Sequence, residues 1–174
     1  SEKKALWDDF VASSKNATFL FYRDFMDYHR DRFEDYSLMV YKDEKLVALL
    51  PANASHKKIV SHQGLTYGGL IVSESIKIKD FTSCLKAVLV YFKKEQFTHV
   101  QIKELPAIYS FVPNEELKYL MFILEASLLR RDTLSVLNLN QKPKPSKDRI
   151  AGNKRAEKHG LRVEEVHDFY TFWN

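Results

Sequence analysis

The sequence predicts an α+β fold, in which helices cover both faces of a mixed, mostly antiparallel sheet of about six strands. Three observations lead to this expectation. Two apolar runs rich in strand-forming residues flank a polar turn at residues 42–45, as in a β-hairpin. Apolar residues then recur at helical spacing over residues 78–95. Finally, strand-like alternation precedes and follows a further helical pattern in the second half of the chain.

The predicted elements follow one another along the chain without a long gap. Each is placed by its apolar periodicity, by strand-forming residues or by a proline or glycine that ends it. Helices are expected over residues 3–13, 21–33 and 78–95 and after Pro113, and strands over residues 37–41, 46–50, 57–61, 70–72, 100–103 and 133–139.

A linker separates the last of these strands from a basic segment. Residues 141–145 contain two prolines and two lysines, and such a run continues neither a strand nor a helix. We therefore predict a first domain over residues 1–140. Residues 141–174 would hold the linker, a basic helix and the start of a truncated second domain.

The segment after the linker carries clear helix signals. Ser146 is placed to cap a helix over residues 147–159, and Gly160 can supply the left-handed residue that ends it. Residues 161–163 then predict a strand, and an aromatic run over residues 169–173 begins another element. Since this tail has no partners of its own, we expect it to fold back on the sheet or to pair with a second copy of the chain, as a homodimer.

The composition is typical of a soluble globular domain. The chain has 174 residues, of which 45% are hydrophobic and 29% are charged, and no run reaches the ~20 apolar residues of a membrane span. The N-terminus lacks the apolar core of a signal peptide, so a cytoplasmic location is expected. Cys84 is the only cysteine, which excludes an intramolecular disulfide, and its helical context indicates a packed apolar residue. No metal is expected, because no histidine lies at ligand spacing from another histidine or from Cys84.

Positive charge is concentrated after the linker. The net charge is +4, and residues 142–162 alone contain eight basic residues against two acidic ones. A solvated helix face is one interpretation of this segment. Contact with the phosphates of tRNA or of a nucleotide-linked ligand is the other. The candidate anion-binding residues are Lys147, Arg149, Lys154, Arg155 and Lys158.

Four segments carry a resemblance to a known family. They are residues 21–29 (FYRDFMDYH), 46–52 (LVALLPA), 63–69 (QGLTYGG) and 153–161 (NKRAEKHGL). Together with the order of elements, they resemble the first domain of Fem-type, two-domain members of the acyl-CoA N-acyltransferase (GNAT) superfamily. The last segment is similar to the basic helix that opens the second domain of the bacterial Fem-type peptidoglycan aminoacyltransferases.

The resemblance implies a transferase. Family members move an acyl or aminoacyl group from acyl-CoA or aminoacyl-tRNA to an amine, and Fem-type members hold the acceptor in a groove between two similar domains. It implies here an acyl- or aminoacyl-transferase domain for a small-molecule or peptide amine, inactive alone because the second domain is almost absent. The alternative is a non-catalytic module of the same fold that binds an anionic partner, such as RNA or a nucleotide-linked precursor.

The glycine-bearing segment is the first candidate for a binding site. Gly64, Gly68 and Gly69 are three of only five glycines, which marks backbone that needs a positive φ or a close approach. The segment lacks the donor-loop pattern of classical acetyltransferases and resembles the turn that lines the Fem acceptor groove. A β-bulge or tight turn is the alternative interpretation. The candidate substrate-binding residues are His62, Gln63, Thr66, Tyr67, Gly68 and Gly69, with Tyr28 and His29 from an aromatic and basic cluster over residues 22–32.

Two of these assignments have plainer alternatives. The cluster over residues 22–32 is also explained as a helix face with cations that extend into solvent. Glu104, at the end of a predicted strand, is the one candidate for a catalytic base. A carboxylate that caps the loop before Pro106 is the alternative interpretation of Glu104.

Overall fold

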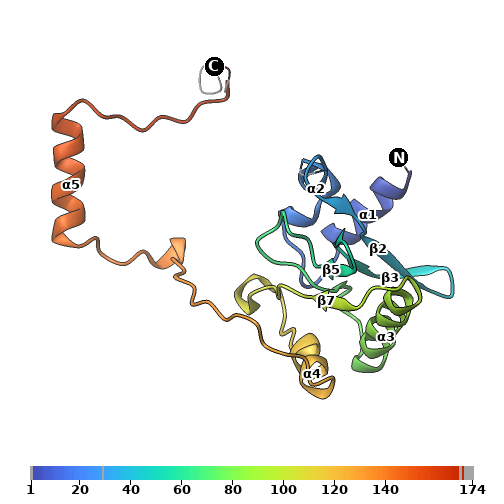
Figure 1. Ribbon diagram of the computed structural model, residues 1–174. Coiled ribbons are helices and arrows are strands. Elements are labelled where there is room, and N and C mark those ends of the chain that lie inside the picture. The colour runs from blue at the N-terminus through green and yellow to red at the C-terminus, as the bar shows by residue number, and fades with distance from the viewer. Residues whose placement is uncertain (1, 29, 169, 171–174) are drawn as a thin grey trace. The chain divides into compact units, whose positions relative to one another are not determined.

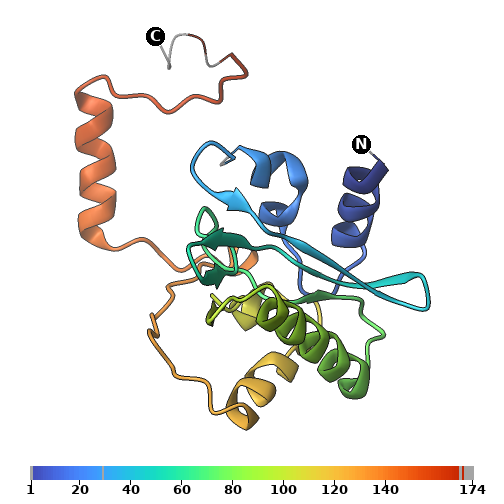
Figure 2. The ribbon, with the colours of Figure 1, turned by 45° about the vertical axis from the view of Figure 1, so that its right-hand side comes forward.

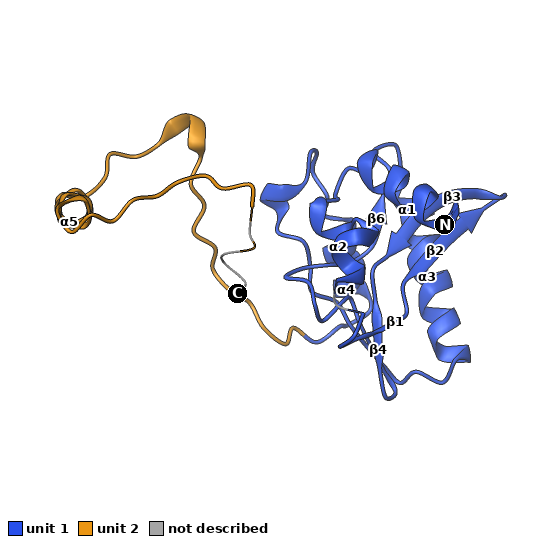
Figure 3. Cartoon of the chain, turned by 90° about the horizontal axis from the view of Figure 1, so that it is seen from above, with its two compact units in different colours: residues 1–127 blue, residues 128–174 orange. Residues whose placement is uncertain are grey.

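A computed structural model describes residues 2–28, 30–168 and 170 (Figure 1). The chain divides into two compact units, which are unit 1 over residues 1–127 and unit 2 over residues 128–174 (Figure 3). Each unit is described by itself. The domain division after residue 140 stays a prediction.

Unit 1 is α+β, as the sequence predicts. Its helices are α1 (Glu2–Ala12), α2 (Arg23–Asp27), α3 (Ile78–Lys94) and α4 (Glu116–Ile123), with the 3-10 turns η1 (Phe19–Phe21) and η2 (Ala107–Tyr109). Its strands are β1 (Glu34–Asp35), β2 (Leu38–Lys42), β3 (Lys45–Leu50), β4 (Asn53–Ser55), β5 (Lys58–Val60), β6 (Ile71–Val72) and β7 (His99–Gln101). Helices α1 and α3 and the β2–β3 hairpin form where the sequence predicts them.

The strands form two sheets, which corrects the expectation of one sheet of about six strands. Among the described residues, β1, β4, β5 and β7 make one sheet in that order, and β2, β3 and β6 make the other. Strand β5 runs parallel to β7, whereas the other pairs are antiparallel. The chain passes through β6 and α3 between the two parallel strands.

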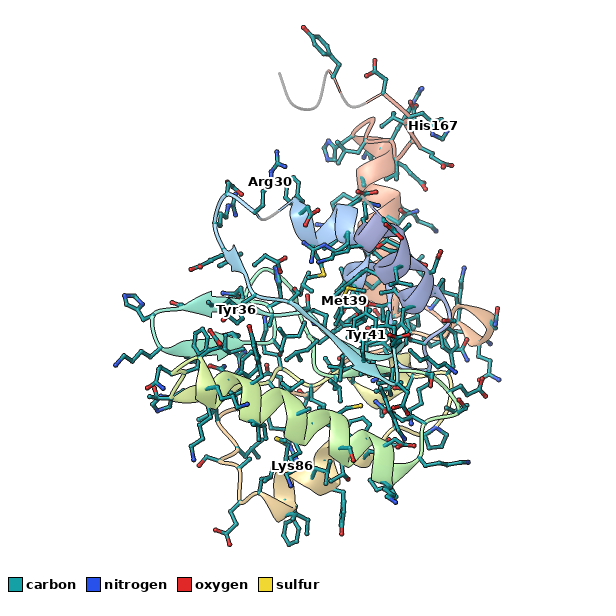
Figure 4. The ribbon with its side chains drawn as sticks, turned by 90° about the vertical axis from the view of Figure 1, so that its right-hand side faces the viewer. Arg30, Tyr36, Met39, Tyr41, Lys86 and His167 are labelled. Atoms are coloured by element: carbon teal, nitrogen blue, oxygen red, sulfur yellow. The ribbon has the colours of Figure 1, made fainter. Side chains whose placement is uncertain are left out.

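Both sheets draw on one long hairpin that is broken in the middle. One arm contains β1 and β2, and the other contains β3 and β4 with Pro51–Ala52 between them. Proline has no N–H to donate, so the ladder is interrupted there. Polar contacts bridge the break, because Tyr36 N donates to Ala52 O at 2.9 Å and Ala52 N donates to Ser37 Oγ at 3.1 Å. Figure 4 shows Tyr36 at this junction.

Alternate residues of the sheet face two different hydrophobic cores. Leu50 and Val72 pack with the buried faces of α3 and α4 in one core. Leu49 and Ile71 pack with α1, η1 and α2 in the other. Helices therefore cover both faces of the sheet formed by β2, β3 and β6, as predicted (Figure 2). Cys84 on α3 is buried in the first core, where burial raises the pKa of its thiol.

The second predicted helix is much shorter than expected. The apolar pattern over residues 21–33 predicts one helix, whereas the structure has η1 and then five helical residues in α2. The Arg23 guanidinium pairs within α2 with Asp27 at 2.5 Å, a spacing that favours the helix, and it also pairs at 2.9 Å with Asp35 of β1, which ties the start of α2 to the next strand. The chain is thereby drawn from helix to strand within a few residues.

A buried ion pair joins the segment after α1 to the start of α4. The Lys15 side chain is 4% exposed, and its ammonium donates to the Glu116 carboxylate. Glu116 occupies the first turn of α4, where the helix dipole favours a negative charge. This pair, together with the apolar side chains that α4 and α3 bury in the same core, holds α4 against the rest of unit 1.

Unit 2 contains the predicted basic helix. After the 3-10 turn η3 (Leu139–Gln141), helix α5 covers Lys147–Lys158. Ser146 caps it, because its side chain accepts a hydrogen bond from Arg149 N, and Gly160 follows its end at a φ of +73°. These capping signals in the sequence are confirmed. None of the helices in the described part of the chain has the length and apolar character needed to cross a membrane.

The strands predicted over residues 133–139 and 161–163 are not formed. Both segments lie outside strands, and their side chains are exposed. Alternation favours a strand only where a neighbouring strand supplies backbone partners, and the described residues of unit 2 contain no such strand. Of the aromatic run over residues 169–173, all but Tyr170 lies outside the described residues.

Candidate functional site

The glycine loop, residues 61–69, lies between β5 and β6. Gly68 forms a parallel bridge with Glu104, so the loop runs beside the chain that continues from β7. A side chain cannot be accommodated at Gly68, because a Cβ there would lie 2.4 Å from the backbone oxygen of Ser61. Gly69 has a φ of +106°, which favours glycine. Both glycines are therefore explained by backbone geometry alone.

A buried asparagine fixes the first part of the loop. Asn53 on β4 is fully buried. Its Oδ1 accepts from Gln63 N at 2.7 Å, and its Nδ2 donates to Gln63 Oε1 at 2.8 Å. The Gln63 side chain is thus directed to a protein partner, and its amide holds the loop in place. The sequence analysis did not find Asn53, because a lone asparagine after a strand is an ordinary turn residue.

Lys103 is the second residue that the sequence analysis missed. Its Nζ donates to the carbonyl oxygens of Gln63, at 3.4 Å, and of Leu65. Its backbone N donates to Ser61 Oγ at 2.7 Å. Burial lowers the pKa of Lys103. The ammonium therefore ties the loop to the chain after β7 while it is partly removed from water.

Aromatic side chains connect the loop with the segment around α2. Tyr67 OH donates to Thr18 Oγ1 at 3.2 Å, and the Tyr67 ring lies 5.9 Å from that of Phe21. His62, which has a φ of +58° and is 3% exposed, stands edge-on to Phe33 with the ring centres 6.0 Å apart. The loop therefore contacts the chain both before and after α2.

Next to the loop, α2 presents a face of exposed aromatic rings. Tyr22, Phe25 and Tyr28 are spaced three residues apart and, with Asp24, line an open depression of about 620 Å³. We call these four residues the aromatic depression. Tyr28 was a predicted site residue, whereas Phe25 and Asp24 were not, although their spacing in the sequence was visible. The predicted residue His29 lies outside the described residues.

The remaining predicted residues differ in what surrounds them. Thr66 and Glu104 are exposed, and Glu104 lies beside Gly68 at the edge of the loop. The Arg23 guanidinium, in contrast, is held in ion pairs and lies 5.4 Å from the centre of the Trp7 ring. Arg30 lies on the loop that follows α2 (Figure 4).

The predicted anion-binding residues belong to unit 2. All five lie on α5, which buries none of its side chains. They are Lys147, Arg149, Lys154, Arg155 and Lys158, and each is exposed. Two acidic residues share the helix, so its charge is positive but not uniform.

The hydrogen bonds of the glycine loop restrict what it can bind. The backbone N–H groups of His62, Gln63, Leu65 and Gly68 all donate to acceptors within the protein. A cradle for a pyrophosphate needs consecutive N–H groups that point to the ligand, and these four do not. Within the described residues, no three His, Cys, Asp or Glu side chains are grouped as metal ligands. The exposed residues at the loop are Gln63, Thr66 and Glu104, and exposed aromatic rings lie on the neighbouring depression.

Comparisons of the chain with protein-family models, with curated proteins and with solved structures find no match.

Proposed function

We propose that unit 1 is an acyl- or aminoacyl-transferase domain that uses an amine as acceptor. The observation that carries the proposal is the path of the chain around the glycine loop. The antiparallel pair of β4 and β5 leads into the glycine loop, which ends β5. After β6, helix α3 leads to β7, which pairs parallel to β5. The chain then continues to Glu104, which lies beside Gly68 of the loop. The succession of helices, antiparallel strands, α3, β7 and α4 follows the order that the family resemblance implies, except that the last strand of that order, over residues 133–139, is not formed.

The proposed reaction needs an acceptor site and a base. The amine nitrogen attacks the acyl carbonyl carbon and an amide bond forms, while the thioester bond of acyl-CoA or the ester bond of aminoacyl-tRNA breaks. The amine gives its proton to a base, and the thiol or hydroxyl leaves protonated. Glu104 is our candidate for the base because it is exposed at the edge of the loop.

We assign the glycine loop to the acceptor rather than to the donor. Four of its N–H groups, including the consecutive ones of His62 and Gln63, already donate within the protein, so these groups do not serve as donors for a pyrophosphate. The neighbouring aromatic depression, although open, adds exposed apolar surface on which the non-polar part of an acceptor can pack.

Calorimetric titration of the 174-residue chain with acetyl-CoA, and separately with aminoacyl-tRNA, tests the proposal. We expect saturable binding of one donor, with uncharged tRNA and free CoA as controls. Glu104→Gln should bind that donor equally well, because the base acts on the acceptor. If neither donor binds to the chain, the transferase proposal fails.

A second candidate function rests on α5. Its five exposed cations favour a module that binds an anionic partner such as RNA or a nucleotide-linked precursor. Affinity for single-stranded RNA should then fall steeply as the salt concentration rises. Arg155→Gln should weaken binding and reduce the salt slope, whereas Lys86→Gln, at an exposed lysine on α3 (Figure 4), should not. RNA binding without donor binding would favour this module over the enzyme.

A further inference from the structure

The aromatic depression combines ring faces with one carboxylate. Tyr22, Phe25 and Tyr28 are 37%, 38% and 72% exposed, which is a large apolar surface for one short helix. Asp24 lies among them, and its side chain is 85% exposed. Aromatic rings attract cations through the negative potential of their faces, and a carboxylate adds charge. This set of groups repels anions and suits an organic cation.

The depression rests on a well-packed base. Met26, on the opposite side of α2, is 2% exposed and belongs to the core that contains α1. The Phe25 ring stands edge-on to Phe19 with their centres 5.5 Å apart. The Phe25 ring therefore has a neighbour in the protein before any ligand arrives, and less of its freedom is lost on binding.

The chain itself supplies an ammonium to this carboxylate. Lys4 Nζ lies 3.2 Å from Asp24 Oδ2, and it lies closer, at 2.7 Å, to Asp8 Oδ2. Asp8 thus holds the ammonium of Lys4 at the edge of the depression, where it competes for Asp24. An external cation would have to share or displace this contact.

We propose that the aromatic depression binds an alkylammonium group of the amine acceptor. The inference rests on the proposed transferase function. An ammonium held by rings and a carboxylate keeps its proton, because both stabilise the charged form. The nitrogen that is acylated must be neutral, so it is a different nitrogen. The acceptor class is therefore a molecule with two amino groups, such as a diamine or a lysine-containing peptide, one of which is bound here.

The test uses choline and its uncharged isostere 3,3-dimethylbutan-1-ol, which differ in charge and hardly in shape. Binding to the 174-residue chain is followed by NMR chemical shifts of the aromatic protons. We expect choline to bind about 2- to 30-fold more tightly than the isostere, the range that cation–π attraction provides. Equal affinities for the two probes would overturn the proposal.

Three variants and one control locate the effect. Tyr28→Leu and Asp24→Asn should each weaken choline binding, while Tyr41→Leu, at an exposed tyrosine on β2 (Figure 4), should leave it unchanged. Lys4→Gln should strengthen it, because Asp24 then loses its internal ammonium. Since Tyr28 is mostly exposed, its replacement should not unfold the domain, and circular dichroism checks this.

The outcome is independent of the donor experiment. If the chain binds choline but neither donor, the aromatic depression is an ammonium site, and the proposal that the ammonium belongs to an acceptor of acyl transfer is refuted. If the chain binds a donor but binds 1,5-diaminopentane no more tightly than pentan-1-ol, the proposal of a diamine acceptor is refuted. The proposed transferase function is not affected by that result. Choline binding that persists undiminished in Tyr28→Leu would place the cation elsewhere and refute the site.

Discussion

Replacing Gly68 by alanine should distort the glycine loop. The new Cβ would lie 2.4 Å from the backbone oxygen of Ser61 and 3.0 Å from its Cβ and Oγ. Contacts under 3.0 Å essentially do not occur, and the obstacle is backbone rather than a flexible side chain. The loop itself must therefore change shape, because Gly68 and Ser61 both belong to it.

The cost can be estimated from the contacts that would be disturbed. Overpacking a rigid site costs about 1–3 kcal/mol. Gly68 N donates to Lys103 O at 2.6 Å, and Lys103 N donates to Ser61 Oγ at 2.7 Å. Each weakened hydrogen bond adds about 0.5–1.5 kcal/mol. We therefore expect Gly68→Ala to destabilise unit 1 by about 2–6 kcal/mol, a large part of the ~5–15 kcal/mol that holds a domain folded.

Urea unfolding followed by tryptophan fluorescence measures this loss, because the buried Trp7 reports on unit 1. Gly152→Ala is the matched control. A Cβ at Gly152, inside α5, meets nothing within 4 Å, so this variant should stabilise the helix by about 0.5–1 kcal/mol and leave the Trp7 transition unchanged. A loss below about 1 kcal/mol for Gly68→Ala would refute the close packing described for the loop.

Three further predictions concern individual side chains. Asn53→Ala should cost about 2–3 kcal/mol in urea unfolding, because it removes both hydrogen bonds between the buried Asn53 side chain and Gln63. Burial lowers the pKa of Lys103 below 10.5. Between the folded pKa and 10.5 the unfolded chain therefore binds more protons than the folded chain, so the free energy of unfolding rises with pH. Lys103→Met should flatten that rise in urea unfolding curves taken across this pH range. Hydrogen bonding to Tyr91, followed by burial, raises the pKa of Tyr36 to about 12, so stability falls as the pH rises from 10 towards 12. The ultraviolet titration of Tyr36→Phe should lack one tyrosinate midpoint near 12, and an unchanged curve would contradict that assignment.

Local signals predicted the elements that depend on local sequence. The β2–β3 hairpin, α3 and the capped start of α5 follow from periodicity and from Ser146, and all three form. The break at Pro51 is visible in the sequence, but the division into two sheets could not be predicted from it, because the pairing of the strands on either side depends on segments far apart in the chain. The early end of α2 could not be predicted either, because the ion pair between Arg23 and Asp35 of β1 forms only in the folded chain.

The sequence predicted the glycine loop of the candidate site, but not the residues from other segments that hold the loop in place. Clustered glycines pointed to the loop, since Gly68 and Gly69 are required by packing and by φ. The residues that fix the loop, Asn53 and Lys103, come from other elements and have no local signal. Lys103 is 38 residues from Leu65 along the chain, and only folding brings them together.

The alternation along β3 affects how unit 1 unfolds. Leu49 and Leu50 are adjacent in the chain but belong to cores on opposite faces of the sheet. Neither core can open while this strand keeps its backbone pairing, and neither can persist once the strand is lost. Amide protons in α1 and α3 should therefore exchange with solvent deuterium through the same global opening, so that a destabilising change in one core accelerates exchange in the helix that packs on the other.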